Sequence, residues 1–399
     1  PDMPNPILSS GPAARPGPLQ GIRVLDLSRL LPGPVCSLHL ADFGAEVIKV
    51  EDPGEGDYAR KLGVAPGQTS TYFRAINRGK RSICLDLKTP AGRDAFLRLA
   101  SQAAVVLESF RPGVVDRLGV GYADVASRNP AVVYCSLTGW GQTGPNREVA
   151  GHDLNYLALA GVLDQIGEAG RPPALSNLQI ADLLGGALTA AMGILAALVQ
   201  ARSTGQGRHI DVAMADAAFA HQYFALHALA TYGRVPPRGS DLLTGAVPCY
   251  RVYPTADGRD LAVGALEPKF WRALCTAIDQ TELLPAQFAT GAAGHAAQTA
   301  LTEVFASRTQ AQWVEALRGI DCCVTPVLTL EEALRDEQFL SRGMVLGNDP
   351  ENLQFGPALR FSESAPLQPG PAPAQGEHTR EVLQEAGFSA AEIAALAGE

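Results

Sequence analysis

The run Gly21-Ile-Arg-Val-Leu-Asp-Leu27 and the later run Ala45-Glu-Val-Ile-Lys-Val-Glu51 decide the fold. Each is a short apolar stretch of the length of a buried strand. Between them lie a turn that contains Pro32-Gly33-Pro34 and a stretch of helical character that continues to Asp42. A strand, a helix and a second strand in this order predict parallel strands joined by a crossover helix.

The chain continues in the same alternation. Further strands are expected at Ser82–Leu87, Ala104–Glu108 and Val132–Leu137, with a helix at Pro90–Ser101, and residues 210–230 are interpreted as one long apolar helix. We therefore expect an α/β fold whose large domain has a parallel sheet of the Rossmann-like type.

A second, smaller domain of mixed α+β structure is expected after a Pro-rich hinge at Val235-Pro-Pro-Arg-Gly-Ser240. There, Cys249–Tyr253 and Asp260–Gly264 flank the turn Ala256-Asp-Gly-Arg259 and predict a β-hairpin. The expected ranges are a flexible lead-in over 1–18, a large domain over 19–228 plus 331–399, and a small domain over 229–330.

Composition excludes several classes of function. A formal charge of −9 over 399 residues argues against nucleic-acid binding, which needs a basic face. The seven cysteines are scattered without a C-x-x-C pair, so we expect no disulfide framework, no metal site and a cytoplasmic location. The apolar run Leu183–Val199 falls short of the ~20 residues of a membrane span, and we expect a helix buried in protein.

A dinucleotide site is one alternative for the first strand–helix–strand unit, because the second strand ends in an acid, Glu51. Such sites bind a pyrophosphate with backbone N–H groups of a Gly-rich turn. The turn here is Leu30-Leu-Pro-Gly-Pro34, and its prolines have no N–H to donate. The sequence therefore disfavours NAD.

Two basic clusters are candidates for a phosphorylated ligand. One is Asn77-Arg-Gly-Lys80-Arg81-Ser82, and the other is Ser109-Phe110-Arg111-Pro-Gly113, followed by Arg117. Ligands of open α/β sheets bind beyond the carboxyl ends of strands, where Phe110 could stack on a purine. Solvated surface charges are the alternative interpretation.

Three residues are candidates for proton chemistry. Asp182 precedes the apolar helix, where it could be an N-cap or a base held beside the positive helix end. His152 lies in the polar cluster Ala150-Gly-His-Asp-Leu-Asn-Tyr156, and an imidazole exchanges protons near neutral pH. Glu267 ends an apolar strand and could orient an imidazole, or it could be a surface acid.

Taken together, these segments resemble the family III CoA-transferase (CaiB/BaiF) superfamily, which includes α-methylacyl-CoA racemases. The resemblance covers roughly residues 18 to 365. It rests on Gly33-Pro34 with Leu40–Glu51, on Asn77–Leu87, on Ser109-Phe-Arg-Pro-Gly-Val114, and on Leu137-Thr-Gly-Trp-Gly-Gln-Thr-Gly-Pro145.

The resemblance implies roles for individual residues. His152 and Asp182 would face each other across a thioester, with Glu267 supporting the imidazole and the backbone N–H of Asp153 binding the enolate oxygen. CoA would be part of the substrate, without a separate cofactor, and the protein would be an intertwined homodimer. The residues implied in CoA binding are Leu31, Asn77, Lys80, Arg81, Ser109, Phe110, Arg111 and Arg117.

Three activities remain open on this resemblance. A racemase would invert the α-carbon of 2-methylacyl-CoA esters by a two-base proton transfer, and it is favoured by Leu31 and Ser240–Ala246, where transferases carry a Gln and a Gly-rich loop. A CoA-transferase would use Asp182 as a nucleophile, and Gly54–Arg74 resembles the longer insertion of transferases. A non-catalytic acyl-CoA-binding protein is the third possibility.

Overall fold

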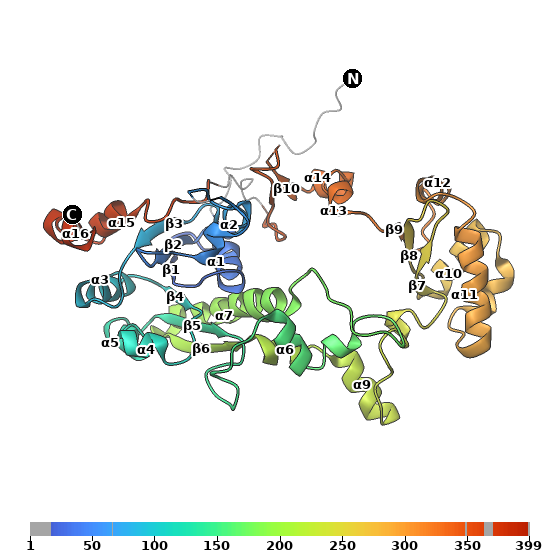
Figure 1. Cartoon of the computed structure of the whole chain (residues 1–399), viewed down its shortest axis with the longest axis horizontal. Helices are drawn as coiled ribbons and strands as arrows, with labels where there is room; N and C mark the ends of the chain where they lie inside the picture. Colours follow the sequence, from blue (N-terminus) through green and yellow to red (C-terminus); the bar gives the residue numbers. More distant parts are fainter. Residues whose placement is uncertain (1–16, 66, 348, 363–369, 398–399) are drawn as a thin grey trace, which may run out of the picture. The chain divides into compact units, whose positions relative to one another are not determined.

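The computed structural model describes residues 17–397 except 66, 348 and 363–369, so the lead-in expected over 1–18 lies almost wholly outside the described residues. The chain forms two compact units, drawn with their elements in Figure 1. The small unit comprises Gly161–Leu175 and Gln222–Leu340, and the other residues form the large unit. The main segment of the small unit thus begins at 222 and ends at 340, where 229 and 330 were expected. The small unit also includes residues 161–175, which the sequence did not indicate.

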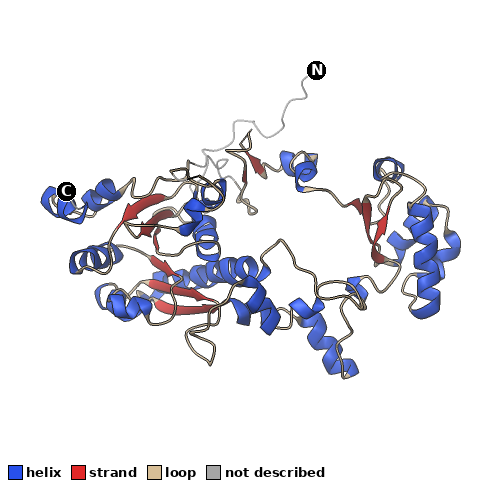
Figure 2. Cartoon of the chain, in the orientation of Figure 1, coloured by secondary structure: helices blue, strands red, loops and turns tan. Residues whose placement is uncertain are grey.

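The large unit is built on a six-stranded sheet in the order β3-β2-β1-β4-β5-β6, with every neighbouring pair parallel (Figure 2). This is the strand order of doubly wound nucleotide-binding folds. The expected parallel, Rossmann-like sheet is therefore confirmed. The strands are β1 (Arg23–Asp26), β2 (Glu46–Glu51), β3 (Arg81–Cys84), β4 (Val105–Glu108), β5 (Val133–Thr138) and β6 (Arg208–Ala213).

Helices lie on both faces of this sheet (Figure 1), which explains why every residue of β4 and of β5 is buried. The core contains Phe96, Val106 and Tyr134, all without exposed surface. The helices of the large unit are α1 (Pro32–Asp42), α2 (Thr71–Asn77), α3 (Pro90–Ala100), α4 (Val114–Leu118), α5 (Tyr122–Arg128), α6 (Asp153–Leu159), α7 (Thr189–Thr204), α8 (Met214–Ala220), α15 (Thr379–Glu385) and α16 (Ala390–Ala397). A short hairpin joins β10 (Val345–Leu346) to β11 (Gln354–Phe355).

The long helix expected over residues 210–230 is wrong. The segment contains the end of β6, then α8 and then α9 (Tyr223–Tyr232), with a break at His221 and Gln222. Strand β6 pairs with β5 along its whole length, so backbone hydrogen bonds to the sheet outweigh the apolar character that continues into α8.

The apolar segment after Asp182 forms a π-helix, η3 (Ala181–Leu188), that continues directly into α7. Among the described residues, this combined helix is long and apolar enough to cross a membrane by length and composition alone. It packs against α1, α8, β5 and β6, with Ala190 and Ile194 fully buried. One face of this helix therefore packs in the large unit, while Leu188, Met192 and Val199 on the rest of its surface are exposed.

The small unit contains an antiparallel sheet in the order β7-β8-β9. The β7–β8 hairpin is the one expected from the sequence. Its core is formed by Tyr253, Trp271, Phe305 and Trp313. The elements are β7 (Tyr250–Pro254), β8 (Asp260–Gly264), β9 (Val324–Pro326), α9, α10 (Pro268–Ala277), α11 (Gly291–Phe305), α12 (Gln310–Ala316) and α13 (Leu330–Ala333), with α14 (Glu337–Ser341) at its end.

Candidate functional site

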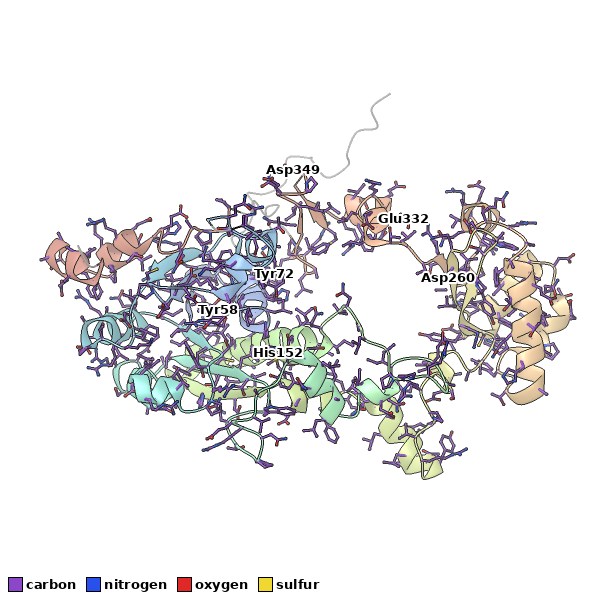
Figure 3. All side chains as sticks on the ribbon, viewed as in Figure 1. Tyr58, Tyr72, His152, Asp260, Glu332 and Asp349 are labelled. Carbon is purple, nitrogen blue, oxygen red and sulfur yellow. The ribbon has the colours of Figure 1, made fainter. Side chains whose placement is uncertain are left out.

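His152 is the N-cap of α6, on the loop that follows the carboxyl end of β5 (Figure 3). Tyr156 fixes this loop from the first turns of the helix: its hydroxyl donates to Gly151 O at 2.5 Å, and its ring packs edge-on against Trp140. A Cβ on Gly139 would lie 2.3 Å from the Tyr156 ring, so a glycine is required there. The His152 imidazole itself is exposed, while its backbone N–H donates to Asn155 Oδ1 at 3.0 Å.

Asp182 lies in the first turn of η3, where Ile180 and not Asp182 is the N-cap, so the expected capping role is wrong. Its backbone N–H donates to Asp153 Oδ1 at 3.1 Å, which ties the start of η3 to the start of α6. Single π-turns are rare and occur frequently at functional sites. Gly186 allows η3 to pack closely on α1, because a Cβ there would lie 2.8 Å from Pro32.

The electrostatics of the site link His152, Asp153 and Asp182. Burial and the nearby Asp153 charge raise the pKa of Asp182 to about 6, and the His152 charge opposes that rise. The carboxyl group therefore exchanges its proton close to neutral pH, where an ordinary Asp, with a pKa of about 3.9, does not. The two residues belong to one unit of the fold, and their placement on opposite sides of a thioester stays a prediction.

Two tyrosines lie within the influence of the Asp182 charge, and the sequence did not indicate them. Burial, together with the negative charge of Asp182, raises the pKa of Tyr72 and of Tyr156 to about 12 in each case. Tyr72 lies in the first turn of α2 (Figure 3). Both phenols therefore keep their protons at neutral pH, and that of Tyr156 is donated to Gly151 O.

A pocket of about 350 Å³ lies at the carboxyl ends of β1 to β4, as expected for ligands of an open α/β sheet. Arg29 lies in it, with its guanidinium carbon 5.2 Å from the centre of the Tyr58 ring and 5.6 Å from that of Phe110. Phe110 was expected here, whereas Arg29 and Tyr58 were missed. Lining residues are Leu27, Arg29, Val50, Glu51, Asp52, Glu55, Gly56, Tyr58, Leu85, Asp86, Leu87, Lys88, Phe110, Val114 and Leu118.

The turn that carries Arg29 is held by a buried ionic cluster. Lys49 Nζ lies 2.8 Å from Asp57 Oδ2 and donates to Ser28 O at 2.9 Å. Asp57 Oδ1 in turn accepts from the backbone N–H of Leu30, whose φ of 65° is in the left-handed region. A residue with a side chain adopts that conformation only when its surroundings hold it there.

Two residues of the first basic cluster, Asn77 and Lys80, are buried inside the large unit. Lys80 is buried and donates to Pro34 O, Ser37 Oγ and Asn77 Oδ1 at 2.8–2.9 Å, and burial lowers its pKa to about 8. Asn77 is buried as well. The polar groups of Lys80 and Asn77 are buried and already have hydrogen-bond partners within the protein. They are therefore not available to bind a ligand in this structure.

The remaining residues expected to bind CoA lie in three different environments. Arg81 pairs with Glu46 at 2.6 Å and with Glu385 at 2.8 Å, so its guanidinium serves to fix α15 to the sheet. Leu31 is the half-buried N-cap of α1, next to Arg29. Ser109, Arg111 and Arg117 follow β4: the Ser109 hydroxyl accepts from the Arg29 N–H at 3.4 Å, and both arginines are exposed.

Glu267 lies in the small unit, where it is the exposed N-cap of α10 and precedes Pro268. It ends the chain segment that leaves β8. Its contact with the imidazole of His152 stays a prediction.

The fold and this site define an α/β protein with acid–base groups and a ligand pocket at the carboxyl ends of its parallel strands. The model of the family "CoA-transferase family III" matches residues 19–379. The chain belongs to that family.

Relatives of this chain include a racemase and a CoA-transferase. α-Methylacyl-CoA racemase of Homo sapiens is 39% identical over 94% of this chain and 95% of its own length. Succinyl-CoA:glutarate CoA-transferase of Mus musculus is 33% identical over 92% and 86%, respectively. Among solved structures, a CAIB/BAIF family protein from Brucella suis is 32% identical with a TM-score of 0.80, covering 93% of this chain and all of that one.

Proposed function

We propose that this protein is a racemase that inverts the α-carbon of 2-methylacyl-CoA thioesters. The observation that carries the proposal is the grouping of His152 with Asp182, whose charges act on each other and whose carboxyl pKa is raised to about 6. A two-base proton transfer needs two groups that can each hold or release a proton at the working pH. The 39% identity to human α-methylacyl-CoA racemase supports the same assignment.

In this mechanism, one group takes the α-proton and the other returns a proton to the opposite face of the carbon. Either His152 or Asp182 can start, depending on which epimer is bound. The intermediate is an enolate, whose oxygen needs a hydrogen-bond donor. The backbone N–H of Asp153, the first residue of α6, has no intrahelical partner and would supply one.

The test is the epimerisation of one stereoisomer of a 2-methylacyl-CoA by the purified protein. Chiral chromatography should find both epimers approaching equal amounts, with the thioester intact. If the substrate keeps its configuration, the racemase proposal fails; tight binding of free CoA with neither epimerisation nor CoA transfer would identify a binding protein.

A CoA-transferase is the second candidate, and one observation favours it. The segment Gly54–Arg74 leads into α2 and brings Tyr72 to Asp182, in a part of the chain that resembles transferases. In that mechanism the Asp182 carboxylate attacks the thioester carbonyl, and the carbon–sulfur bond breaks to give an acyl anhydride and the CoA thiolate. The thiolate then attacks the Asp182 carbonyl of the anhydride, which releases the carboxylic acid and leaves CoA on Asp182 as a thioester. Hydroxylamine should then inactivate the enzyme only after exposure to acyl-CoA, whereas a racemase should keep its activity.

For CoA itself, we propose that the purine lies in the pocket at the carboxyl ends of β1 to β4. Arg29, Tyr58 and Phe110 offer a guanidinium plane and two rings on which a base can stack. Ser109, Arg111 and Arg117 follow β4 on the loop and helix beside Phe110, so exposed positive charge is available for phosphate oxygens.

Arg29→Ala is expected to weaken the binding of free CoA about tenfold, because stacking on one side chain contributes ~1–3 kcal/mol per base. Isothermal titration calorimetry with free CoA measures this without catalysis. Arg93→Ala is the matched control, since Arg93 is half-buried in α3, outside the residues that line the pocket, and pairs with its neighbour Asp94. Equal affinities in all three proteins would contradict the placement of the purine.

We further propose an intertwined homodimer in which Glu267 of one copy supports His152 of the other. Helix α9 of the small unit exposes a row of large apolar residues, and such patches mark interfaces. They are Phe224 (66% exposed), Leu226, Leu229 and Tyr232. The inactive variants His152→Ala and Glu267→Ala should regain activity when refolded together, since one of the two shared sites is then intact; no recovery would contradict a shared site.

A further inference from the structure

We propose that the Asp153 side chain is a positioning residue for Asp182: it fixes the backbone at the start of η3 and places a second carboxylate beside the base. The inference rests on the proposed function for its catalytic meaning. It assigns the side chain of Asp153 a role separate from that of its backbone N–H.

The contact itself joins two segments that are distant in sequence. Asp153 Oδ1 accepts a hydrogen bond from the Asp182 N–H at 3.1 Å, and α6 packs against η3. An acid in the first turn of a helix is favourable because of the helix dipole, and this alone could account for Asp153. Stabilisation by the dipole of α6 does not require a contact with Asp182. The hydrogen bond does make that contact, and it fixes the backbone of Asp182 in the first turn of η3.

The negative charge of Asp153 also affects the pKa of Asp182. A like charge disfavours ionisation of a carboxyl group, and burial adds to this effect. Burial is the larger cause of the raised pKa of Asp182 and Asp153 is the next, while His152 acts in the opposite direction. A base whose pKa lies near the working pH both accepts and returns protons efficiently.

The other groups around Asp182 do not supply this charge. Tyr156 of α6 and Tyr72 of α2 are neutral phenols at pH 7, because their pKa values are raised to about 12. From α1 and α8, the side chains packed on η3 at Gly186 are those of Pro32 and Met214, which carry no charge. Among the described residues, Asp153 is the acid whose charge raises the pKa of Asp182, and His152 is the cation that opposes it.

Asp153→Asn separates the two effects, because the amide oxygen still accepts the Asp182 N–H while the charge is gone. The pKa of Asp182 should fall by about 0.5–1 unit. The carboxylate is the form that takes a proton, so activity that is lost on acidification should then be lost at a lower pH. Asp153→Ala also removes the hydrogen bond to the Asp182 N–H. Its kcat should be about tenfold lower than that of Asp153→Asn, with KM little changed.

The experiment follows the carboxyl signal of Asp182 by carbon-13 NMR in protein labelled at aspartate, with Asp182→Asn to assign the signal. The matched control is Asp124→Asn: Asp124 also lies in the first turn of a helix and accepts a backbone N–H, that of Gly121 at 3.1 Å. The pKa of Asp182 should be unchanged in the control and lowered in Asp153→Asn.

An unchanged pKa in Asp153→Asn, or an Asp153→Ala variant with the kcat of the control, would overturn the inference. Because the NMR titration needs no turnover, it is independent of the racemase assignment. A lowered pKa in a protein that does not epimerise thioesters would therefore support the positioning of Asp182 while refuting the proposed function.

Discussion

His152→Ala is expected to lower the rate of epimerisation of a 2-methylacyl-CoA about 10²–10⁴-fold, the usual contribution of one general acid–base group. Without the imidazole, Asp182 can remove or return a proton on one face only, so inversion stops in both directions. The rate is measured by following epimerisation at saturating substrate. The variant should fold normally, because the imidazole is exposed and α6 keeps its backbone cap.

The matched control is His295→Ala, which removes an exposed histidine from α11 of the small unit. It should epimerise at the rate of the unaltered protein. If His152→Ala also retained full activity, His152 would have no part in the proton transfer, and the two-base mechanism would be wrong.

Lys49→Met is expected to lower the free energy of unfolding by about 3–5 kcal/mol, the usual cost of removing one partner of a buried ion pair. Lys49 and Asp57 have at most 1% of their side-chain surface exposed. Burial would raise the pKa of Asp26, but the charges of Lys49 and Lys80 and hydrogen bonds from two serines hold it below its usual value. Without Lys49, Lys80 alone would face both carboxylates.

Urea unfolding followed by circular dichroism measures this effect. Lys61→Met is the matched control, because Lys61 makes an exposed pair with Glu55 at 3.8 Å. Pairs of that kind contribute at most about 1 kcal/mol. A loss for Lys49→Met no larger than that of the control would show that the buried cluster does not hold the turn of Arg29.

The parallel sheet was predictable because its strands are short apolar runs in a regular alternation with helices. Strand β6 was missed for a reason that lies in its residues. It contains Arg208, His209 and Asp211, which are exposed, and its buried end, Val212 and Ala213, runs directly into α8. Apolar periodicity also cannot separate the π-helix at Ala181–Leu188 from an α-helix, because eight residues are too few to distinguish the two helical periods.

The catalytic candidates were found through motifs, while the binding residues were found only in part. The sequence shows that Lys80 and Arg81 are charged, but not that the first is buried and the second is paired with Glu46 and Glu385. Arg29 is a single charge in a loop. Its position just after the first strand was the available signal, because ligands bind beyond the carboxyl ends of such strands.

The central claim, that His152 and Asp182 move a proton on and off one carbon, is tested most directly in heavy water. The protein is incubated with 2-methylacyl-CoA in D₂O, and the recovered thioester is analysed by mass spectrometry and proton NMR. We predict one deuterium at the α-carbon of both epimers and none elsewhere in the acyl chain. Recovery of thioester without deuterium at the α-carbon would contradict the account.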